Sequence, residues 1–186
     1  MKISGNEIKI GMIIEHNNDL WEVLKTQHVK PGKGGAFNQV EMKSINRETK
    51  LNERFRSSDN VERAIVEEME FNFLYEDKDE FYFINNKTFE QINIKKELIG
   101  EKSKFLSEGL EVKLGIYNDV PIKIYLPNQI ECKIEMTDAA IKGQTAASSY
   151  KPALLENGVN ILVPPFVESG DTIIVDTRTI EYIKKV

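Results

Sequence analysis

The stretch that decides the fold is Lys30-Pro31-Gly32-Lys33-Gly34-Gly35-Ala36-Phe37. Strand-like sequence flanks it on both sides, from Leu20 to Val29 and from Asn38 to Ile45. A turn-forming proline and several glycines between two such runs predict a β-hairpin that carries this loop at its tip. Gly32 is expected to adopt the positive φ that follows a proline in a tight turn. Lys33 would then project without a neighbouring side chain, either as an ordinary exposed turn lysine or as a functional one.

Positive charge is concentrated around this loop. The whole chain of 186 residues has a net charge of −5. Residues 24–56 nevertheless carry eight lysines and arginines against three glutamates, which gives this segment a net charge of +5. A basic patch tied to one structural feature indicates binding to a polyanion such as RNA, with a plain solvated face as the alternative. The acidic remainder argues against indiscriminate nucleic-acid binding, because it would repel most of a duplex.

The composition is that of a soluble globular protein, with 40% hydrophobic and 30% charged residues. No apolar run approaches the ~20 residues that a membrane span needs, and the first residues lack the apolar core of a signal peptide, so a cytoplasmic location is expected.

Cys132, the single cysteine, is expected to be a buried small hydrophobe on an alternating strand. His16 and His28 have no carboxylates nearby with metal or acid–base spacing, so the sequence predicts neither an enzyme nor a metal site.

The chain as a whole predicts an all-β fold of three small β-barrels. Strand-like runs from residue 6 to Phe55 predict an SH3-like barrel in residues 1–63. A second hairpin around residues 76–80, one helix between Ile94 and Gly109, and two further strands predict an OB-type barrel in residues 64–127. Strands at 130–136, 159–163, 172–176 and 179–183 predict a C-terminal OB-type barrel in residues 128–186. Cores this small are expected to pack end to end into one rigid rod or elbow.

Two motifs at opposite ends of the chain are similar to one known family. The Lys-Pro-Gly-Lys-Gly-x-Ala-Phe loop at 30–37 closely resembles that of bacterial translation elongation factor P. The family's C-terminal signature is matched in spacing by Lys151, Ala153, Gly158, Ile161, Val163, Pro164, Val167 and Gly170. Residues 85–91 and 176–178 also look like family sequence, so the similarity covers the whole chain. It implies an N-terminal SH3-like (KOW-like) barrel and two OB-fold barrels in an L-shaped arrangement similar in size to tRNA.

The resemblance also implies a function. A member of this family would be a cytoplasmic, monomeric translation elongation factor without enzymatic activity or membrane contact. It would bind the 70S ribosome, through rRNA and ribosomal proteins, between the P and E sites and contact the P-site tRNA. By holding that tRNA in place it would stimulate peptide-bond formation and relieve stalling at consecutive prolines. No cofactor is expected, apart from a covalent β-lysyl or similar extension that a lysine-modifying enzyme would add to Lys33.

Site residues carried over from the resemblance fall into two groups. Contact with the tRNA and the peptidyl-transferase centre is assigned to Lys30, Pro31, Gly32, Lys33, Gly34, Gly35, Ala36 and Phe37. Further candidate RNA contacts are Lys25, His28, Lys43, Arg54, Arg56, Lys142, Lys151, Tyr182 and Lys185. The chain departs from the family pattern at Gln144, where many members have aspartate, so no acidic role is carried over to that position.

Two other functions are compatible with an exposed hairpin lysine. A swinging-arm carrier protein would bear biotin or lipoate on Lys33. A carrier function does not explain the glycine flanks, the three barrels or the basic patch. An RNA-binding transcription or chaperone factor would share the basic hairpin, but its activity would not depend on Lys33. The mass of the group attached to the native protein separates the carrier from the elongation factor.

Overall fold

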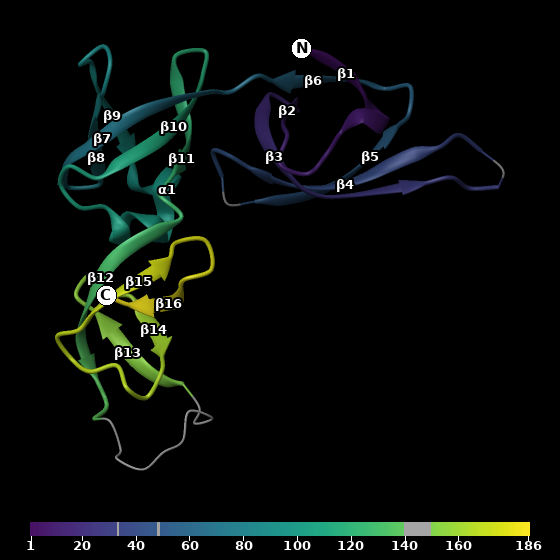
Figure 1. The fold of residues 1–186 in the computed structure, drawn as a ribbon. Helices are drawn as coiled ribbons and strands as arrows, with labels where there is room; N and C mark the ends of the chain where they lie inside the picture. The colour runs from purple at the N-terminus through teal and green to yellow at the C-terminus, as the bar shows by residue number, and fades with distance from the viewer. Residues whose placement is uncertain (33, 48, 140–149) are drawn as a thin grey trace. The chain divides into compact units, whose positions relative to one another are not determined.

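The computed structural model describes residues 1–32, 34–47, 49–139 and 150–186, and these are built almost entirely from β-strands. The strands form one six-stranded and two five-stranded sheets (Figure 1). The all-β, multi-barrel fold predicted from the sequence is confirmed. The chain divides into two compact units, residues 1–69 with 113–124 and residues 70–112 with 125–186. The three-domain division at residues 63 and 127 stays a prediction.

The first sheet contains the predicted hairpin. Its order is β1-β6-β2-β3-β4-β5. The strands are β1 (Lys2–Ser4), β2 (Ile13–His16), β3 (Asp19–Val29), β4 (Phe37–Ser44), β5 (Lys50–Arg56) and β6 (Asn60–Ala64). Residues 6–16 were predicted as a strand with a bend or bulge at Gly11, and this is confirmed only for β2: a 3-10 turn, η1 (Gly5–Glu7), occupies the start, and Gly11 turns the chain at φ 82°. The Glu7 carboxylate accepts a hydrogen bond from the Ser4 backbone N–H at 2.8 Å and stabilises that turn.

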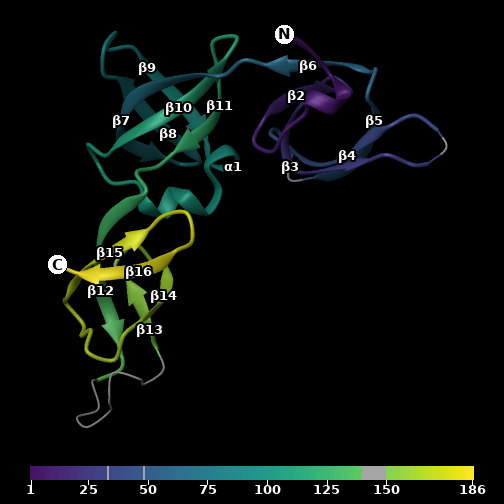
Figure 2. The same cartoon turned by 45° about the vertical axis from the view of Figure 1, so that its right-hand side comes forward.

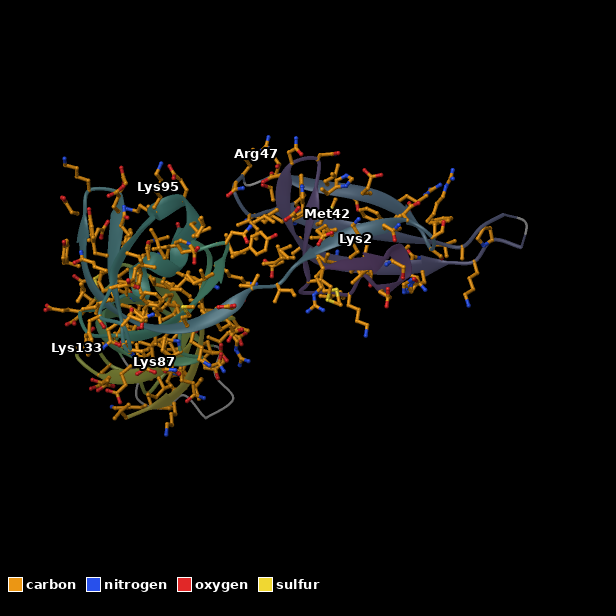
Figure 3. The ribbon with its side chains drawn as sticks, turned by 90° about the horizontal axis from the view of Figure 1, so that it is seen from above. Lys2, Met42, Arg47, Lys87, Lys95 and Lys133 are labelled. Atoms are coloured by element: carbon orange, nitrogen blue, oxygen red, sulfur yellow. The ribbon has the colours of Figure 1, made fainter. Side chains whose placement is uncertain are left out.

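Strict alternation along β4 separates a buried face from an exposed one. Asn38, Val40, Met42 and Ser44 are buried, whereas the residues between them are partly or fully exposed. Val40 and Met42 belong to a core with Ile14, Val23 and Phe55, and Figure 3 labels Met42 inside this barrel and Arg47 at its periphery. Burial of these apolar side chains is the main stabilising term for the barrel.

The second sheet has the order β11-β10-β7-β8-β9. Its strands are β7 (Glu67–Asp77), β8 (Glu80–Asn85), β9 (Gln91–Lys95), β10 (Glu111–Tyr117) and β11 (Val120–Tyr125), so the second predicted hairpin is confirmed. The helix predicted between Ile94 and Gly109 is confirmed only in part. The chain forms only the single turn α1 (Lys96–Ile99) and the 3-10 helix η2 (Gly100–Phe105). Gly100, at φ 62°, interrupts the helix, and Ile99 and Phe105 are buried from two separate short turns.

The third sheet has the order β14-β13-β12-β15-β16. Its strands are β12 (Gln129–Thr137), β13 (Lys151–Leu155), β14 (Asn160–Val163), β15 (Thr172–Asp176) and β16 (Glu181–Lys185). The sequence pattern did not indicate β13, because Pro152 lies inside it and proline is disfavoured in strands. Cys132 is only half-buried at the edge of this core, so the prediction of a buried cysteine was wrong in degree. The partial burial raises the pKa of its thiol.

Candidate RNA-binding hairpin

The β3–β4 hairpin extends beyond the rest of the first sheet in both views (Figures 1 and 2). Its last paired residues are Val29 and Phe37, so residues 30–36 form the connecting loop. Lys30, Pro31, Gly32, Gly34 and Gly35 are exposed. Lys33 lies outside the described residues, and its assignment as a modified residue therefore stays a prediction.

The positive φ in this loop lies at Gly34 and not at Gly32, as the sequence analysis had expected. Gly34 has φ 118°, a conformation that residues with a Cβ rarely adopt. A Cβ placed on Gly32 or Gly35 would meet no atom within 4 Å, and one on Gly34 would meet only Pro31 Cγ, at 3.8 Å. Few atoms therefore lie close to the backbone of the described part of the loop. Gly34 is the glycine among them that needs a positive φ.

The base of the loop is held by contacts from β5 and from the turn that follows it. The Ala36 carbonyl accepts hydrogen bonds from Ser57, through the backbone N–H at 3.1 Å and through Oγ at 3.0 Å. The Arg54 guanidinium carbon lies 4.3 Å from the centroid of the Phe37 ring, within the range of a cation–π interaction. These contacts fix both the backbone and the side chains at the point where the loop begins.

A buried amide anchors the same end of β4 from the other side. Asn38 is fully buried, and its Nδ2 donates to the carbonyl oxygens of Gly5 at 3.1 Å and Ile8 at 3.3 Å. Neither this anchor nor the role of Ser57 was predicted from the sequence, because an asparagine in a strand and a serine in a polar turn have no distinguishing pattern. Both roles depend on segments that are 20 or more residues away in the sequence.

One face of the hairpin end is basic. The register places Arg56 opposite Phe37 and Arg54 opposite Gln39, whereas Asn38 pairs with Phe55 on the buried face. Directly paired residues share a face of a sheet, so both arginines lie on the outer face with Phe37. Within the described chain, neither guanidinium has a carboxylate within 4.0 Å. Two unneutralised cations thus lie next to the loop.

Other cations of the basic segment are neutralised or distant from the loop. Lys25 and Lys50 both approach Glu41, at 3.5 and 3.9 Å, and Arg47 is paired with Asp19 at 3.1 Å. Lys43 lies on the same face as Arg54, but six residues along β4 from Phe37, a separation of about 20 Å. Among the described residues, Arg54 and Arg56 are therefore the arginines of the basic segment that lie beside the loop without a carboxylate partner.

His28 does not join this surface. It is exposed and pairs with Asn38, whose side chain points to the core, so His28 lies on the opposite face of the hairpin from Arg54 and Arg56. A single RNA backbone lying along the arginine face would not reach it. The sequence analysis grouped these residues by proximity in the chain, and the alternation of side chains in a strand separates them.

The C-terminal candidates have different environments. Lys185 forms an ion pair with Asp171 at 2.6 Å, and the hydrogen bond within this pair lowers the pKa of that carboxyl. The Lys151 ammonium donates a hydrogen bond to the Asp138 carbonyl. Tyr182 is half-buried against the C-terminal core and is more a packing residue than an open platform. Lys142 and Gln144 lie outside the described residues.

Two kinds of site are not found in the part of the chain that the structure describes. None of its His, Cys, Asp and Glu side chains form a group of three or more able to hold a metal ion. None of its helices is long and apolar enough to span a membrane.

Comparison with known proteins accounts for the whole chain. Residues 4–61 match the model of the elongation factor P KOW-like domain, residues 66–124 that of the elongation factor P OB domain, and residues 130–185 that of the elongation factor P C-terminal domain. Elongation factor P from Pelagibacter ubique is 64% identical over 186 residues and covers 100% of both chains. The chain belongs to the elongation factor P family. Elongation factor P from a Chelativorans species is 52% identical over 185 residues, covering 100% of this chain and 99% of the relative.

Solved structures show the same fold at low sequence identity. Eukaryotic translation initiation factor 5A from Methanococcus jannaschii is 21% identical, with a TM-score of 0.58, and the match covers 67% of this chain and 93% of that one. A translation initiation factor eIF-5A family protein from Naegleria fowleri is 14% identical, with a TM-score of 0.51, covering 68% and 98%. As a member of this family, the chain is a translation elongation factor, and the family is one of translation factors and not of enzymes or cofactor-dependent proteins.

Proposed function

We propose that this elongation factor binds the ribosome between the P and E sites and places the loop at residues 30–37 against the acceptor end of the P-site tRNA. The observation that carries this proposal is an open glycine-rich loop on a firmly held base. A narrow RNA-lined channel admits such a loop because few side chains obstruct it. The contacts of Ala36 and Phe37 keep its direction constant.

The mechanism is one of orientation. Proline is a constrained secondary amine, so reactive alignment with the peptidyl-tRNA is rarely sampled. A factor that restrains the P-site tRNA increases the fraction of time for which the reacting groups are aligned, and it thereby stimulates peptide-bond formation at consecutive prolines. Arg54 and Arg56 would bind phosphates of the tRNA acceptor stem and set the register of the hairpin on the RNA.

In this proposal, Lys33 is the residue at the tip of the hairpin loop that reaches the tRNA. A lysine-modifying enzyme would extend it with a β-lysyl or similar amine-bearing group, and no other cofactor is needed. The neighbouring glycines leave such an enzyme free access, because Gly32 and Gly34 have no side chains to obstruct it. A longer cationic arm would reach tRNA phosphate and ribose that the lysine alone would not.

In this proposal, the rest of the chain holds the hairpin loop at the correct distance from the P-site tRNA. We propose that domains of residues 1–63, 64–127 and 128–186 bridge the ribosomal subunits, with rRNA and ribosomal proteins as partners, and that the factor acts as a cytoplasmic monomer. Lys151 and Lys185 are secondary candidates for RNA contact near the small subunit. Both belong to ion pairs or hydrogen bonds within the chain, so their contribution is expected to be smaller than that of Arg54 and Arg56.

Reconstituted translation of a Pro-Pro-Pro template tests the proposal. Lys33→Ala is expected to reduce rescue of stalled synthesis to the level without factor, while the far-ultraviolet circular dichroism and the unfolding midpoint stay unchanged. Lys87→Ala, an exposed lysine in the turn between β8 and β9, is the matched control and should retain full rescue. Full rescue by the Lys33→Ala variant would contradict the proposal.

Intact mass of the protein purified from its native cell tests the modification. An increment equal to a lysyl or similar amine-bearing group on the peptide that contains Lys33 is expected. A biotin or lipoate increment would instead identify a carrier protein.

A further inference from the structure

Two tyrosines stack on the outer face of the second sheet, far along the chain from the loop. Tyr75 of β7 pairs with Tyr82 of β8, and their ring centroids are 4.7 Å apart with an angle of 19° between the ring planes. Their neighbours Phe73, Phe81 and Phe83 are buried on the opposite face. Tyr75 is 50% exposed, so a large aromatic surface faces solvent. The buried core on the opposite face does not include this ring.

Two carboxylates border this pair, and neither forms an ion pair within the described residues. Tyr82 Oη donates a hydrogen bond to Glu80 at 3.1 Å, which raises the pKa of Tyr82. The next pair along the same face is Asp77 and Glu80. Within the described residues, neither carboxylate has a lysine or arginine nitrogen within 4.0 Å. Glu76, which faces the other way, is paired with Lys96 at 3.6 Å.

Amide groups extend the polar part of the surface. Gln91 Nε2 lies 3.4 Å from Tyr75 Oη, and Asn93 of β9 pairs with Tyr82. Lys95, labelled in Figure 3, pairs with Glu80 in register and is the cation at the rim. The face thus offers ring faces, carboxylates and hydrogen-bond acceptors to a donor-rich ligand.

Arginine fits this combination better than the alternatives. A guanidinium group stacks flat on an aromatic ring and donates a pair of parallel hydrogen bonds to a carboxylate, whereas an ammonium group does neither as well. Nucleic acid would also stack on tyrosines, but its phosphates would meet Asp77 and Glu80, and residues 61–127 carry fourteen acidic against nine basic side chains. Charge complementarity therefore favours a basic protein segment.

We propose that the outer face of β7, β8 and β9, centred on Tyr75 and Tyr82, binds an arginine-bearing basic segment of a protein partner. Arginine side chains lie against the exposed tyrosine and pair with Asp77 and Glu80. The surface acts independently of the hairpin loop, so loss of Lys33 does not affect it.

Fluorescence anisotropy on the full chain tests this proposal. The probe is a labelled eight-residue peptide with four arginines alternating with glycine, and its lysine counterpart has the same length and charge. The arginine peptide is expected to bind saturably and at least about threefold more tightly than the lysine peptide. Asp77→Asn with Glu80→Gln, which retains the stack, is expected to weaken binding at least about fivefold. Tyr75→Ala should reduce the preference for arginine.

The matched control removes two exposed carboxylates from β12. Glu131→Gln with Glu135→Gln changes the net charge by the same amount and should leave binding within about twofold of the original. Backbone amide shifts in an NMR titration should be largest at Tyr75, Tyr82 and Asn93. Equal losses in the two double variants, equal affinity for both peptides, no saturable binding, or shifts centred elsewhere would each overturn the proposal. Tighter binding of a ten-nucleotide oligouridine to this face would overturn it in favour of RNA.

Discussion

The Arg54 guanidinium lies over the ring of Phe37, 4.3 Å from its centroid. This contact connects β5 to the first residue after the loop. One arginine therefore has two roles at the base of the hairpin. It restrains the direction of the loop, and it presents a charge that no carboxylate of the described chain neutralises. The two roles can be separated by substitution.

Arg54→Lys retains the charge and loses the flat stacking of the guanidinium on Phe37, whereas Arg54→Met loses the charge. Each is expected to lower the free energy of unfolding by less than about 1 kcal/mol, because an exposed cation–π contact contributes little. We expect Arg54→Met to reduce both ribosome affinity and rescue of Pro-Pro-Pro synthesis, and Arg54→Lys to reduce rescue more than affinity. Urea unfolding and translation assays measure these effects. Unchanged rescue in both variants would show that the contact does not position the loop.

Gly5→Ala is expected to destabilise the first barrel. A Cβ at this position would lie 2.3 Å from the Arg56 carbonyl oxygen and 3.0 Å from Phe55 Cβ, so η1 and β5 must move apart. Such overpacking costs about 1–3 kcal/mol, measured as a lower urea midpoint. Gly35→Ala is the control, since its Cβ would meet no atom within 4 Å and its φ is not positive. Equal midpoints for the two variants would contradict this account.

Asp19→Asn is expected to lower stability by about 1–3 kcal/mol at neutral pH. Burial disfavours the charged carboxylate, but hydrogen bonds from Ser44 Oγ, Asn46 Nδ2 and the Leu20 N–H, with Arg47 nearby, outweigh burial and lower the pKa of Asp19. A lowered folded-state pKa means that ionised Asp19 stabilises the fold above its ordinary pKa near 3.8, and that this contribution is lost as the pH falls through the lower folded value.

Urea unfolding of both proteins across pH measures this effect. The difference in the free energy of unfolding should be constant from about pH 5 to 8 and should shrink below about pH 4. Glu108→Gln, an exposed carboxylate without an ion pair in the described chain, should show no such difference. A gap between Asp19→Asn and the original protein that persists unchanged at low pH would indicate a packing defect instead.

Salt dependence reports whether Arg56 binds phosphate. If it does, Arg56→Gln should lower the slope of log affinity for the ribosome against log salt concentration by about 0.7–0.9, because one fewer counterion is released. Lys87→Gln removes one exposed charge from the turn between β8 and β9 and should leave the slope unchanged. Filter binding or sedimentation at several ionic strengths measures both slopes. An unchanged slope for Arg56→Gln would remove this residue from the RNA contact.

Local patterns explain which predictions were confirmed. The arms of both hairpins alternate with a period of two, and proline and glycine occupy the turns, so a short window of sequence is sufficient to predict them. The helix predicted within residues 94–109 and the strand predicted over residues 6–16 are only partly confirmed, because glycines with positive φ, at Gly100 and Gly11, divide those segments. Several apolar residues of these two segments are buried although the backbone around them is irregular. Their spacing therefore follows neither the helical nor the strand period.

The sequence by itself determined the all-β class, the glycine-rich loop at a hairpin tip, and a basic segment around it, because each is a property of residues close together in the chain. Only the tertiary structure decided which charges matter at the loop. Strand register brings Arg54 and Arg56 beside Phe37, directs His28 to the other face, and pairs Lys25, Lys50 and Arg47 with carboxylates. It also anchors the loop base through Ser57 and Gly5, because hydrogen bonds and close contacts between distant segments exist only once the barrel has closed.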